Sequence, residues 1–383
     1  MRSDGATKAA VIADIGIGAG GGTDGACATK AAIEVNYFFF QNTCETRGMC
    51  SAAAAAVVKR AKMSAIALQR KKRLGERITM VTAYDYPSAL HCERAGIDAI
   101  LVGDSLGMVE LGYSTTQPVT LDEMIHHAKA VGRGAQSPLL VGDLPFGTYE
   151  VSPAQGLQSA YRYVKEAGVD CVKLEGGRMR ADTVRKIVDG GVAVMGHVGL
   201  TPQHISVLGG FRAQGRTAAK ARMILDDALA LQDAGAFAVV IECVPAPVAA
   251  AITAELEIPT IGIGAGGGTD GQVLVYHDML GMTTHPHYKQ FIPKFCKSFV
   301  DCGSLVAEGL EAYKAQVQSG AFPAEDHSPY KMSAAELEIF DEMLAERKEG
   351  SADVERRAKI KRRIGEADEY EAAGLYGDQG SKS

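Results

Sequence analysis

The chain has 383 residues, of which 46% are hydrophobic and 22% charged, and its formal net charge is −6 at pH 7. This composition is ordinary for a globular enzyme, and the negative charge gives no reason to expect nucleic-acid binding, which usually needs a basic face. No apolar run reaches the roughly 18 residues of a membrane span. The length permits two or three domains, or one barrel of roughly 250 residues with extensions.

The cysteine pattern argues against a disulfide framework or a zinc site. None of the eight cysteines forms a C-x-x-C pair, so in a chain of this length we expect reduced, mostly buried thiols of an intracellular protein. The eight are Cys27, Cys44, Cys50, Cys92, Cys171, Cys243, Cys296 and Cys302.

Residues 1–65 differ from the rest, being rich in Ala and Gly without a clear amphipathic period. The string IGIGAGGGTDG at 15–25 recurs letter for letter at 261–271. An exact copy is too faithful for a structural repeat, whose units share only a pattern. We favour a recent duplication or an incorrect start of the reading frame, and expect 1–65 to be an atypical, disordered or transit-like extension.

A basic segment lies between Glu45 and Glu76, where no acidic residue occurs. If translation began at Met49, this segment would have the composition of an organelle transit peptide. A solvated basic first helix is an equally good interpretation, so a mitochondrial and a cytoplasmic location both stay open.

From about residue 78 short apolar runs alternate with amphipathic stretches. Continuous apolar runs suit strands that are buried on both faces, as in a parallel sheet. Eight such runs predict an α/β fold of the (β/α)8 TIM-barrel type rather than a doubly wound sheet. The runs are 78–85, 99–105, 139–146, 171–177, 192–200, 239–245, 259–266 and 272–279.

The stretches between the runs carry helix signals. Thr120 and Glu123 form a capping box, and Ser152 followed by Pro153 is an N-cap with proline at the first helical position. Gly168 stands where that helix should end, and Thr217 can cap another helix. The weak point is the link between runs seven and eight, which leaves room for little more than one helical turn.

The predicted barrel domain covers 66–332, and a C-terminal helix with a charged tail covers 333–383. A helical region is expected from Ile292 to Gln318, and a further helix should be capped by Ser333 with Glu336. Residues 347–383 are dense in charges of both signs, so we expect a solvated tail that is at most partly helical.

Ionisable side chains recur where the predicted strands end, which is the side on which a TIM barrel carries its active site. Each of them alone is more readily explained as a turn or capping residue. Seven strand ends with such groups are harder to dismiss, because a ring of unpaired carboxylates would repel itself. The residues are Asp85, Asp104, Ser105, Asp143, Lys173, Glu175, His197, Glu242, His277 and Asp278.

That repulsion requires a counter-charge. Asp104, Asp143 and Glu175 could supply hard oxygen ligands, and such a set suits Mg²⁺, which keeps several waters and accepts a chelating substrate. Lys173 lies two residues before Glu175, so both side chains point to one face of the strand. A lysine among carboxylates can hold an anionic group, and a 2-oxo acid offers that anion and a second oxygen for the metal.

Two other motifs are assigned to loops. Gly262, Gly264 and Gly267 match G-x-G-x-x-G, but no long helix can follow directly, so a tight barrel loop is favoured over a dinucleotide site. The run 285–287, His-Pro-His, is likewise expected to be loop rather than ligand. His126 and His127 are neighbours on a helix, where at least one should face solvent.

Eight longer motifs follow one another along the chain: RITMVTAYDYPSA, VGDSLGMVELGY, TTQPVTLDEM, VGDLPFGTYEVSP, VKLEGG, GHVGLTPQ, VVIECVP and IGIGAGGGTDGQVLVYHDMLGM. These motifs resemble the ketopantoate hydroxymethyltransferase family, also called 3-methyl-2-oxobutanoate hydroxymethyltransferase. The similarity runs from about 66 to 332 with the motifs in family order. The ending HSPYKM resembles the plant-like branch, for which a mitochondrial location is usual.

The resemblance implies a barrel of the phosphoenolpyruvate/pyruvate superfamily that binds Mg²⁺ and a 2-oxo acid. Asp104 and Ser105 correspond to residues that hold metal and 2-oxo acid, and Asp143 to a metal ligand that also contacts substrate. Lys173 corresponds to the substrate-binding lysine of VKLEGG, and Glu175 to a metal ligand.

The resemblance also implies the reaction and the assembly. Glu242 corresponds to the proton acceptor, and His197 should lie close to the reacting carbon. The family transfers a hydroxymethyl group from 5,10-methylenetetrahydrofolate to 3-methyl-2-oxobutanoate, the first step of pantothenate synthesis, and is often a homodecamer. We therefore expect small-molecule partners and a homo-oligomer, without nucleic acid or membrane.

Three alternatives remain at this point. One is another Mg²⁺-dependent lyase or mutase on a 2-oxo acid, for which the metal carboxylates would serve equally well. Another is a catalytically silent barrel kept as an assembly subunit. The third, a nucleotide-binding module, depends on the glycine run alone.

Overall fold

The computed structural model describes residues 60–210, 212–283, 293–349 and 351–372. The chain divides into two units, Met1–Ala61 and Lys62–Ser383, and the barrel lies in the second. The repeat at 15–25, the part of the basic segment before Arg60 and the His-Pro-His run lie outside the described residues, and the predicted domain limits stay predictions.

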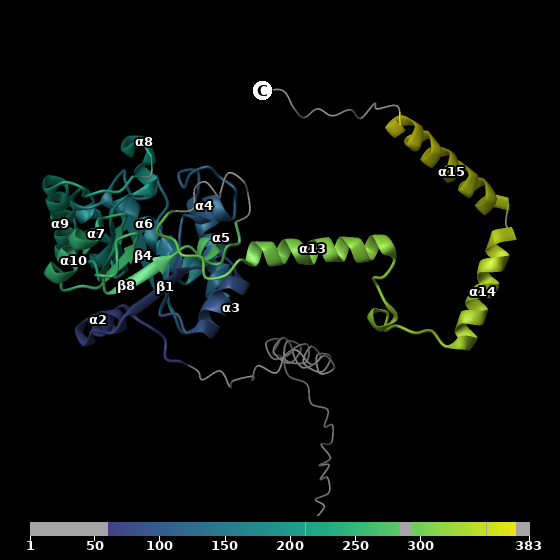
Figure 1. Ribbon diagram of the computed structural model, residues 1–383, viewed down its shortest axis with the longest axis horizontal. Helices are drawn as coiled ribbons and strands as arrows, with labels where there is room; N and C mark the ends of the chain where they lie inside the picture. Colours follow the sequence, from purple (N-terminus) through teal and green to yellow (C-terminus); the bar gives the residue numbers. More distant parts are fainter. Residues whose placement is uncertain (1–59, 211, 284–292, 350, 373–383) are drawn as a thin grey trace, which may run out of the picture. The chain divides into compact units, whose positions relative to one another are not determined.

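Eight parallel strands close into a barrel in sequence order, with β1 paired to β8 (Figure 1). Each predicted apolar run overlaps one strand, so the predicted (β/α)8 fold is confirmed. The strands are β1 Ile78–Thr82, β2 Ala99–Val102, β3 Leu139–Asp143, β4 Cys171–Glu175, β5 Ala193–Gly199, β6 Ala238–Glu242, β7 Thr260–Ile263 and β8 Gly271–Leu274.

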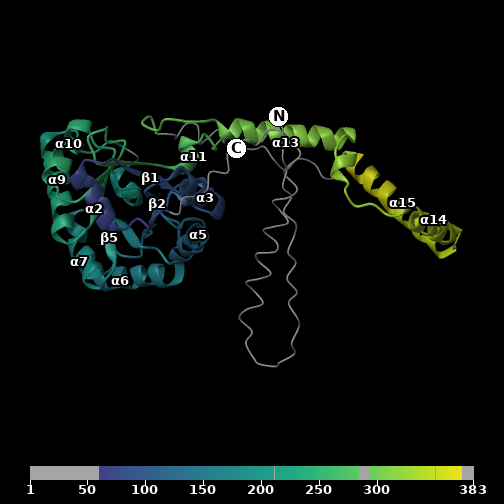
Figure 2. The ribbon, with the colours of Figure 1, turned by 90° about the horizontal axis from the view of Figure 1, so that it is seen from below.

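Helices surround the strands, and Figure 2 shows α3, α5, α6, α7, α9 and α10 around the barrel. The helices that precede or surround the barrel are α2 Ala65–Leu74, α3 Tyr86–Ala95, α5 Leu121–Gly134, α6 Pro153–Arg162, α7 Ala181–Asp189, α9 Ala218–Asp233 and α10 Ala246–Glu255. Short helical pieces are α4 Leu106–Val109, η1 Tyr163–Ala167, η2 Arg178–Arg180, η3 Pro202–His204, α8 Ile205–Leu208, α11 Tyr276–Met279 and η4 Glu325–His327. The later helices are α13 Cys302–Ser319, α14 Ala334–Glu349 and α15 Ser351–Ala372. Among the described helices, none is both long and apolar enough to cross a membrane.

The predicted helix ends are confirmed by cap geometry. The capping box of Thr120 and Glu123 begins α5, and the Ser152 hydroxyl accepts from Gln155 N at the start of α6. Thr217 caps α9 in the same way. Helix α6 continues into the π-helical turn η1, which ends at Gly168 in the left-handed conformation. Local capping chemistry therefore sets these helix limits.

Two predictions near the end of the barrel need comment. Residues 264–270, between β7 and β8, form turns without a helix, as the short link suggested. The eighth run was expected to continue as strand to residue 279, which is wrong, because 276–279 form α11. Tyr276 N donates to Thr82 Oγ1 instead of to a neighbouring strand, which ends the ladder.

The C-terminal predictions were partly wrong. Helix α13 begins at Cys302 rather than near Ile292, because the Asp301 carboxylate caps Ser304 N, while Phe299 N and Cys302 N donate to Met279 O and Leu280 O. Ser333 does cap α14, through Glu336 N. Where burial is described, the tail is exposed except for the half-buried Asp353, as predicted. It is helical over α15, because its many Ala, Glu, Lys and Arg residues have high helix propensity.

Two apolar layers form the core. The inner layer fills the barrel with side chains such as Met80, Val141 and Val240, and the outer layer packs side chains such as Val172 against the helices. Leu68 of α2 is fully buried in the inner layer, so α2 closes the amino-terminal end of the barrel.

Ion pairs attach α2 to the barrel. Lys71 Nζ lies 2.9 Å from Asp98 Oδ2, and Lys72 Nζ lies 2.9 Å from Asp270 Oδ2. All four side chains are at most 20% exposed, so water screens these pairs less than it screens surface pairs. The end of the barrel that α2 covers is thus fastened by charge as well as by apolar packing.

The remaining predictions concern cysteines and histidines. All five cysteines within the described residues are free thiols, of which Cys92 and Cys171 are buried and the others partly buried. His126 is exposed, while His127 Nδ1 lies 2.7 Å from Tyr84 O, as expected for neighbours on a helix.

Candidate active site

A polar cluster lies at the carboxyl ends of β2 to β6 and consists of Asp104, Asp143, Lys173, Glu175, His197 and Glu242. Asp143, Glu175 and Glu242 are each the last residue of a strand. Alternation along β4 places Lys173 and Glu175 on the inner face with Cys171, a member of the inner apolar layer. The ladder sets Asp143 opposite Lys173 and Glu175 opposite His197. Apolar side chains therefore fill the barrel interior, and charged ones occupy its carboxyl end.

Lys173 and Asp143 form a buried ion pair. The Lys173 Nζ atom lies 2.7 Å from Asp143 Oδ1, and the two side chains are 5% and 2% exposed. Asp104 N also donates to Asp143 Oδ2, at 3.2 Å. Burial lowers the pKa of Lys173, but the carboxylates of Asp143, Glu175 and Asp104 raise it by more, so the ammonium stays charged.

The carboxylates of Asp104, Asp143 and Glu175 together carry more negative charge than the single ammonium of Lys173 can neutralise. Burial, then repulsion by Asp143, raises the pKa of Asp104 to about 7. Burial raises the pKa of Asp143 to about 6 although Lys173 lowers it, and burial also raises the pKa of Glu175. The site is thus strained electrostatically without a further cation.

His197 lies between the lysine and the fourth acid. Its Nδ1 atom is 3.4 Å from Lys173 Nζ, and its Nε2 atom is 3.2 Å from Glu242 Oε2. Burial and the Lys173 charge lower the pKa of His197 to about 3, so its imidazole is neutral at working pH. Burial raises the pKa of Glu242 to about 7, opposed by Lys173. Because Glu242 is 16% exposed, it is the acid of the cluster most open to a ligand.

The backbone around Glu242 is closely constrained. Leu200 N donates to Glu242 O at 2.9 Å, and a Cβ on Gly199 would lie 2.2 Å from that oxygen. Gly199 has φ +95°, and the next residue after the acid, Cys243, has φ +50°, a left-handed conformation that costs energy for a residue with a Cβ. The position of the carboxylate is therefore set by tight packing and a strained turn.

The other predicted strand-end residues have different environments. Ser105 Oγ shares a 2.8 Å hydrogen bond with Tyr84 Oη, beside Asp104. Asp85 caps α3 through Ser88, which is the structural role that such residues often have. His277 Nε2 lies 3.2 Å from Glu110 Oε1, and its ring lies 5.5 Å, centroid to centroid, from the ring of Tyr84.

Sequence reasoning overlooked Gln203 and Tyr149. Gln203 is fully buried, and its side-chain amide donates to Asp104 Oδ2 at 2.9 Å. The Tyr149 hydroxyl donates to Gln203 Oε1 and lies 3.4 Å from Glu175 O. A search for ionisable strand ends passes over a neutral amide, although GHVGLTPQ contains it directly after β5.

The donor set fits a hard divalent cation in chemical type. Asp104, Asp143 and Glu175 bring carboxylates from three adjacent strand ends, and their excess charge is the kind that Mg²⁺ neutralises. Within the described residues, however, no three His, Cys, Asp or Glu side chains already stand in a metal-holding arrangement. Lys173 and Gln203 lie among the acids and hold Asp143 and Asp104.

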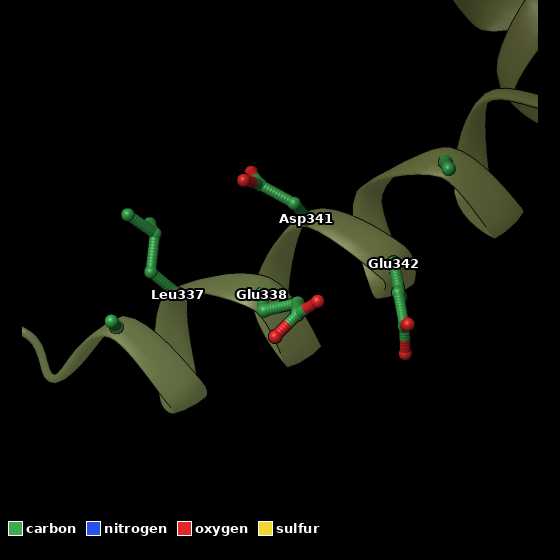
Figure 3. A pocket seen from close by; sticks show the side chains of 6 residues that line it. Leu337, Glu338, Asp341 and Glu342 are labelled. Atoms are coloured by element: carbon green, nitrogen blue, oxygen red, sulfur yellow. The ribbon is translucent and has the colours of Figure 1, made fainter.

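Two other features are structural. The glycine run is a tight loop, as expected, because a Cβ on Gly266 would lie 2.4 Å from Ala246 Cβ, and one on Gly268 would lie 2.8 Å from Ala250 Cβ. The hollow in Figure 3 is lined by residues of α14 alone, so it is the surface of one helix, distant in sequence from the polar cluster.

Comparison with known proteins identifies the family of the chain. Residues 62–325 match the family model described as ketopantoate hydroxymethyltransferase. The chain is 58% identical over 274 residues to 3-methyl-2-oxobutanoate hydroxymethyltransferase 1, mitochondrial, of Arabidopsis thaliana, covering 71% of this chain and 79% of the relative. It is 54% identical over 272 residues to 3-methyl-2-oxobutanoate hydroxymethyltransferase of Moorella thermoacetica, covering 71% and 99%.

A solved structure of 2,3-dimethylmalate lyase, a PEP mutase/isocitrate lyase superfamily member, is similar at 14% identity with a TM-score of 0.44. The similarity covers 75% of this chain and 99% of that one, and we take no function from it. The family match spans more than half of the chain, and the two relatives are each more than half identical to it over nearly the same residues. The chain belongs to the ketopantoate hydroxymethyltransferase family.

Proposed function

We propose that this chain transfers a hydroxymethyl group from 5,10-methylenetetrahydrofolate to 3-methyl-2-oxobutanoate, giving 2-dehydropantoate. The names of its relatives support this assignment. The observation that carries it is the position of Glu242, a partly exposed acid with a raised pKa that contacts His197, whose ring also contacts the buried Lys173.

Substrate binding is assigned to Lys173 with Ser105 and Asp143. The ammonium of Lys173 is charged and buried, so it attracts the carboxylate of a 2-oxo acid in a medium where charges are weakly screened. Ser105 supplies a hydroxyl beside Asp104. We assign metal binding to Asp104, Asp143 and Glu175.

A bound Mg²⁺ would supply Lewis-acid stabilisation of negative charge on the keto oxygen, worth several kcal/mol. Glu242 removes the C3 proton of the oxo acid. A base whose pKa lies near the working pH is well suited to this step, and a positioned base typically contributes about 10²–10⁴ in rate. His197 is neutral, so it does not lower the basicity of Glu242 by bringing a positive charge next to it.

The carbon–carbon bond then forms between C3 and the methylene carbon of the folate. The electron pair released from the C3–H bond makes the new C–C bond, while one C–N bond of the methylene breaks and its nitrogen takes that electron pair. Water then adds its oxygen to the methylene carbon as the second C–N bond breaks and the second nitrogen takes that pair. The proton held by Glu242 and the proton released by water go to the two folate nitrogens, so Glu242 ends unprotonated.

The test is incubation with 3-methyl-2-oxobutanoate, methylenetetrahydrofolate and Mg²⁺. We expect 2-dehydropantoate, together with folate-independent exchange of the C3 proton in deuterated water. Turnover of the oxo acid that ignores the folate would indicate a lyase or mutase instead. Absence of both reactions would indicate a silent barrel.

Location and assembly are proposed on separate grounds. Plant relatives are named mitochondrial, and with the basic segment before residue 74 this supports a mitochondrial location over a cytoplasmic one, testable by N-terminal sequencing of the mature protein. A homodecamer is proposed by family resemblance. The exposed apolar residues Leu305, Leu310 and Tyr313 on α13 are compatible with burial in an assembly, testable by analytical ultracentrifugation.

A further inference from the structure

Gln203 is an uncharged side chain buried among the acids of the site. It is fully buried, on the η3 turn that follows β5. Its main-chain N donates to Glu175 Oε2 at 3.0 Å, and its Nε2 atom donates to Asp104 Oδ2 at 2.9 Å and to Leu144 O at 3.0 Å. One residue thus binds two of the three acids assigned to the metal.

The orientation of the amide is determined by its neighbours. Both N–H bonds of Nε2 point at acceptors, Asp104 and Leu144, while Oε1 accepts from the Tyr149 hydroxyl. A flipped amide would set its oxygen against the Asp104 carboxylate and the Leu144 carbonyl, where oxygen would repel oxygen. Both N–H groups of the amide are therefore occupied, one by Asp104 and one by Leu144 O.

The turn that carries Gln203 is itself held in place. Gln117 Nε2, from the segment before α5, donates to Gln203 O at 2.9 Å, and Ser206 Oγ donates to Gln117 Oε1 at 3.3 Å. The Tyr149 hydroxyl also accepts from Glu175 N at 3.3 Å, so it connects the amide to the end of β4. Because these bonds fix the side-chain conformation of Gln203, its amide can in turn restrict the conformation of the Asp104 carboxylate.

The three acids assigned to the metal are bound by two different sets of groups. Asp143 is paired with Lys173 and Asp104 N, whereas Asp104 and Glu175 each give one oxygen to Gln203. Fixing one oxygen of a carboxylate also fixes the direction of the other. We propose that Gln203 is a positioning residue that sets Asp104 and Glu175 for the divalent cation, with Tyr149 acting through it. This inference rests on the metal site of the proposed function.

The test measures Mn²⁺ binding to the full chain by the electron paramagnetic resonance signal of free Mn²⁺. Residues that orient metal ligands typically change affinity about 10–100-fold when replaced, and we expect a loss in this range for Gln203→Met. Tyr149→Phe should lose less. The double variant should lose little more than Gln203→Met, because without the amide the Tyr149 hydroxyl contacts only main-chain atoms of Glu175 among the three acids.

Matched controls separate positioning from folding. Gln136→Met and Tyr161→Phe change exposed residues whose side chains bind backbone oxygens outside the site, and both should keep wild-type Mn²⁺ affinity. The Mn²⁺ affinity is expressed per folded chain. If Gln203 only stabilised the fold, its replacement would leave this affinity unchanged. If Gln203→Met does not fold, Tyr149→Phe decides, since it removes a single oxygen.

Two results would overturn the inference in different ways. Wild-type affinity in Gln203→Met and Tyr149→Phe, together with lost affinity in Asp143→Ala, would reject the role of Gln203 and leave the proposed metal site intact. No Mn²⁺ binding by the wild-type chain would reject the metal site and this inference together.

Discussion

Replacement of Glu242 by Gln should stabilise the protein while it removes the proposed base. Burial raises the pKa of Glu242 from 4.5 to about 7, so the folded chain holds this proton more tightly than the unfolded chain does. Between these pH values the unfolded state binds fewer protons, and stability therefore falls as pH rises. At about 1.36 kcal/mol per pKa unit, the ionised side chain costs roughly 3 kcal/mol above pH 7.

Glutamine mimics the protonated form and does not pay that cost. The difference in unfolding free energy between Glu242→Gln and wild type should grow by about 3 kcal/mol from pH 4.5 to pH 8, measured by urea denaturation. Other titrating groups contribute equally to both proteins and cancel. Glu338→Gln, on an exposed face of α14, controls for the loss of one charge.

The same variant should bind Mg²⁺ and the oxo acid but lose exchange of the C3 proton, followed by NMR in deuterated water. Full exchange would remove Glu242 from the role of base. A stability difference that stays constant with pH would refute the reasoning that burial disfavours its charge.

Further outcomes are expected from the site and its support. Asp143→Ala should lose metal-dependent activity, and undiminished turnover would reject the proposed metal ligands. Gly199→Ala should destabilise the chain by about 1–3 kcal/mol in urea and slow exchange, because the new Cβ meets Glu242 O; an unchanged protein would show that the turn yields. The exchange rate constant kcat/KM should rise with pH through about 7 as Glu242 ionises, and a rate that falls over this range would contradict a carboxylate base.

The barrel could be predicted because its strands are buried on both faces and read as apolar runs. Helix limits with capping residues, such as Thr120 and Ser152, were equally accessible. The end of β8 was not, because it depends on the bond between Tyr276 N and Thr82 Oγ1, residues far apart in sequence. The start of α13 depends similarly on bonds to Met279 and Leu280.

In the site too, residue types could be predicted from the sequence, whereas contacts between residues far apart in the chain could not. The acids and Lys173 are visible in the sequence because ionisable residues rarely end apolar strands. Their pairing depends on the register between β3 and β4, which sets Lys173 opposite Asp143. Gln203 could not be found in this way, since its function depends on how the turn after β5 folds back over Asp104 and Glu175.

The seating of α2 sets a limit on proteolytic trimming from the amino terminus. A shortened polypeptide that starts near Lys62 keeps Leu68 buried at the amino-terminal end of the barrel. It also keeps the ion pairs of Lys71 and Lys72. One that starts beyond Leu74 would open the base of the barrel to water and give up roughly 1.5–3 kcal/mol for Leu68 alone. Any peptidase that matures this enzyme must therefore cut upstream of α2. A cut within or after α2 would expose apolar side chains of the inner layer to water and favour aggregation.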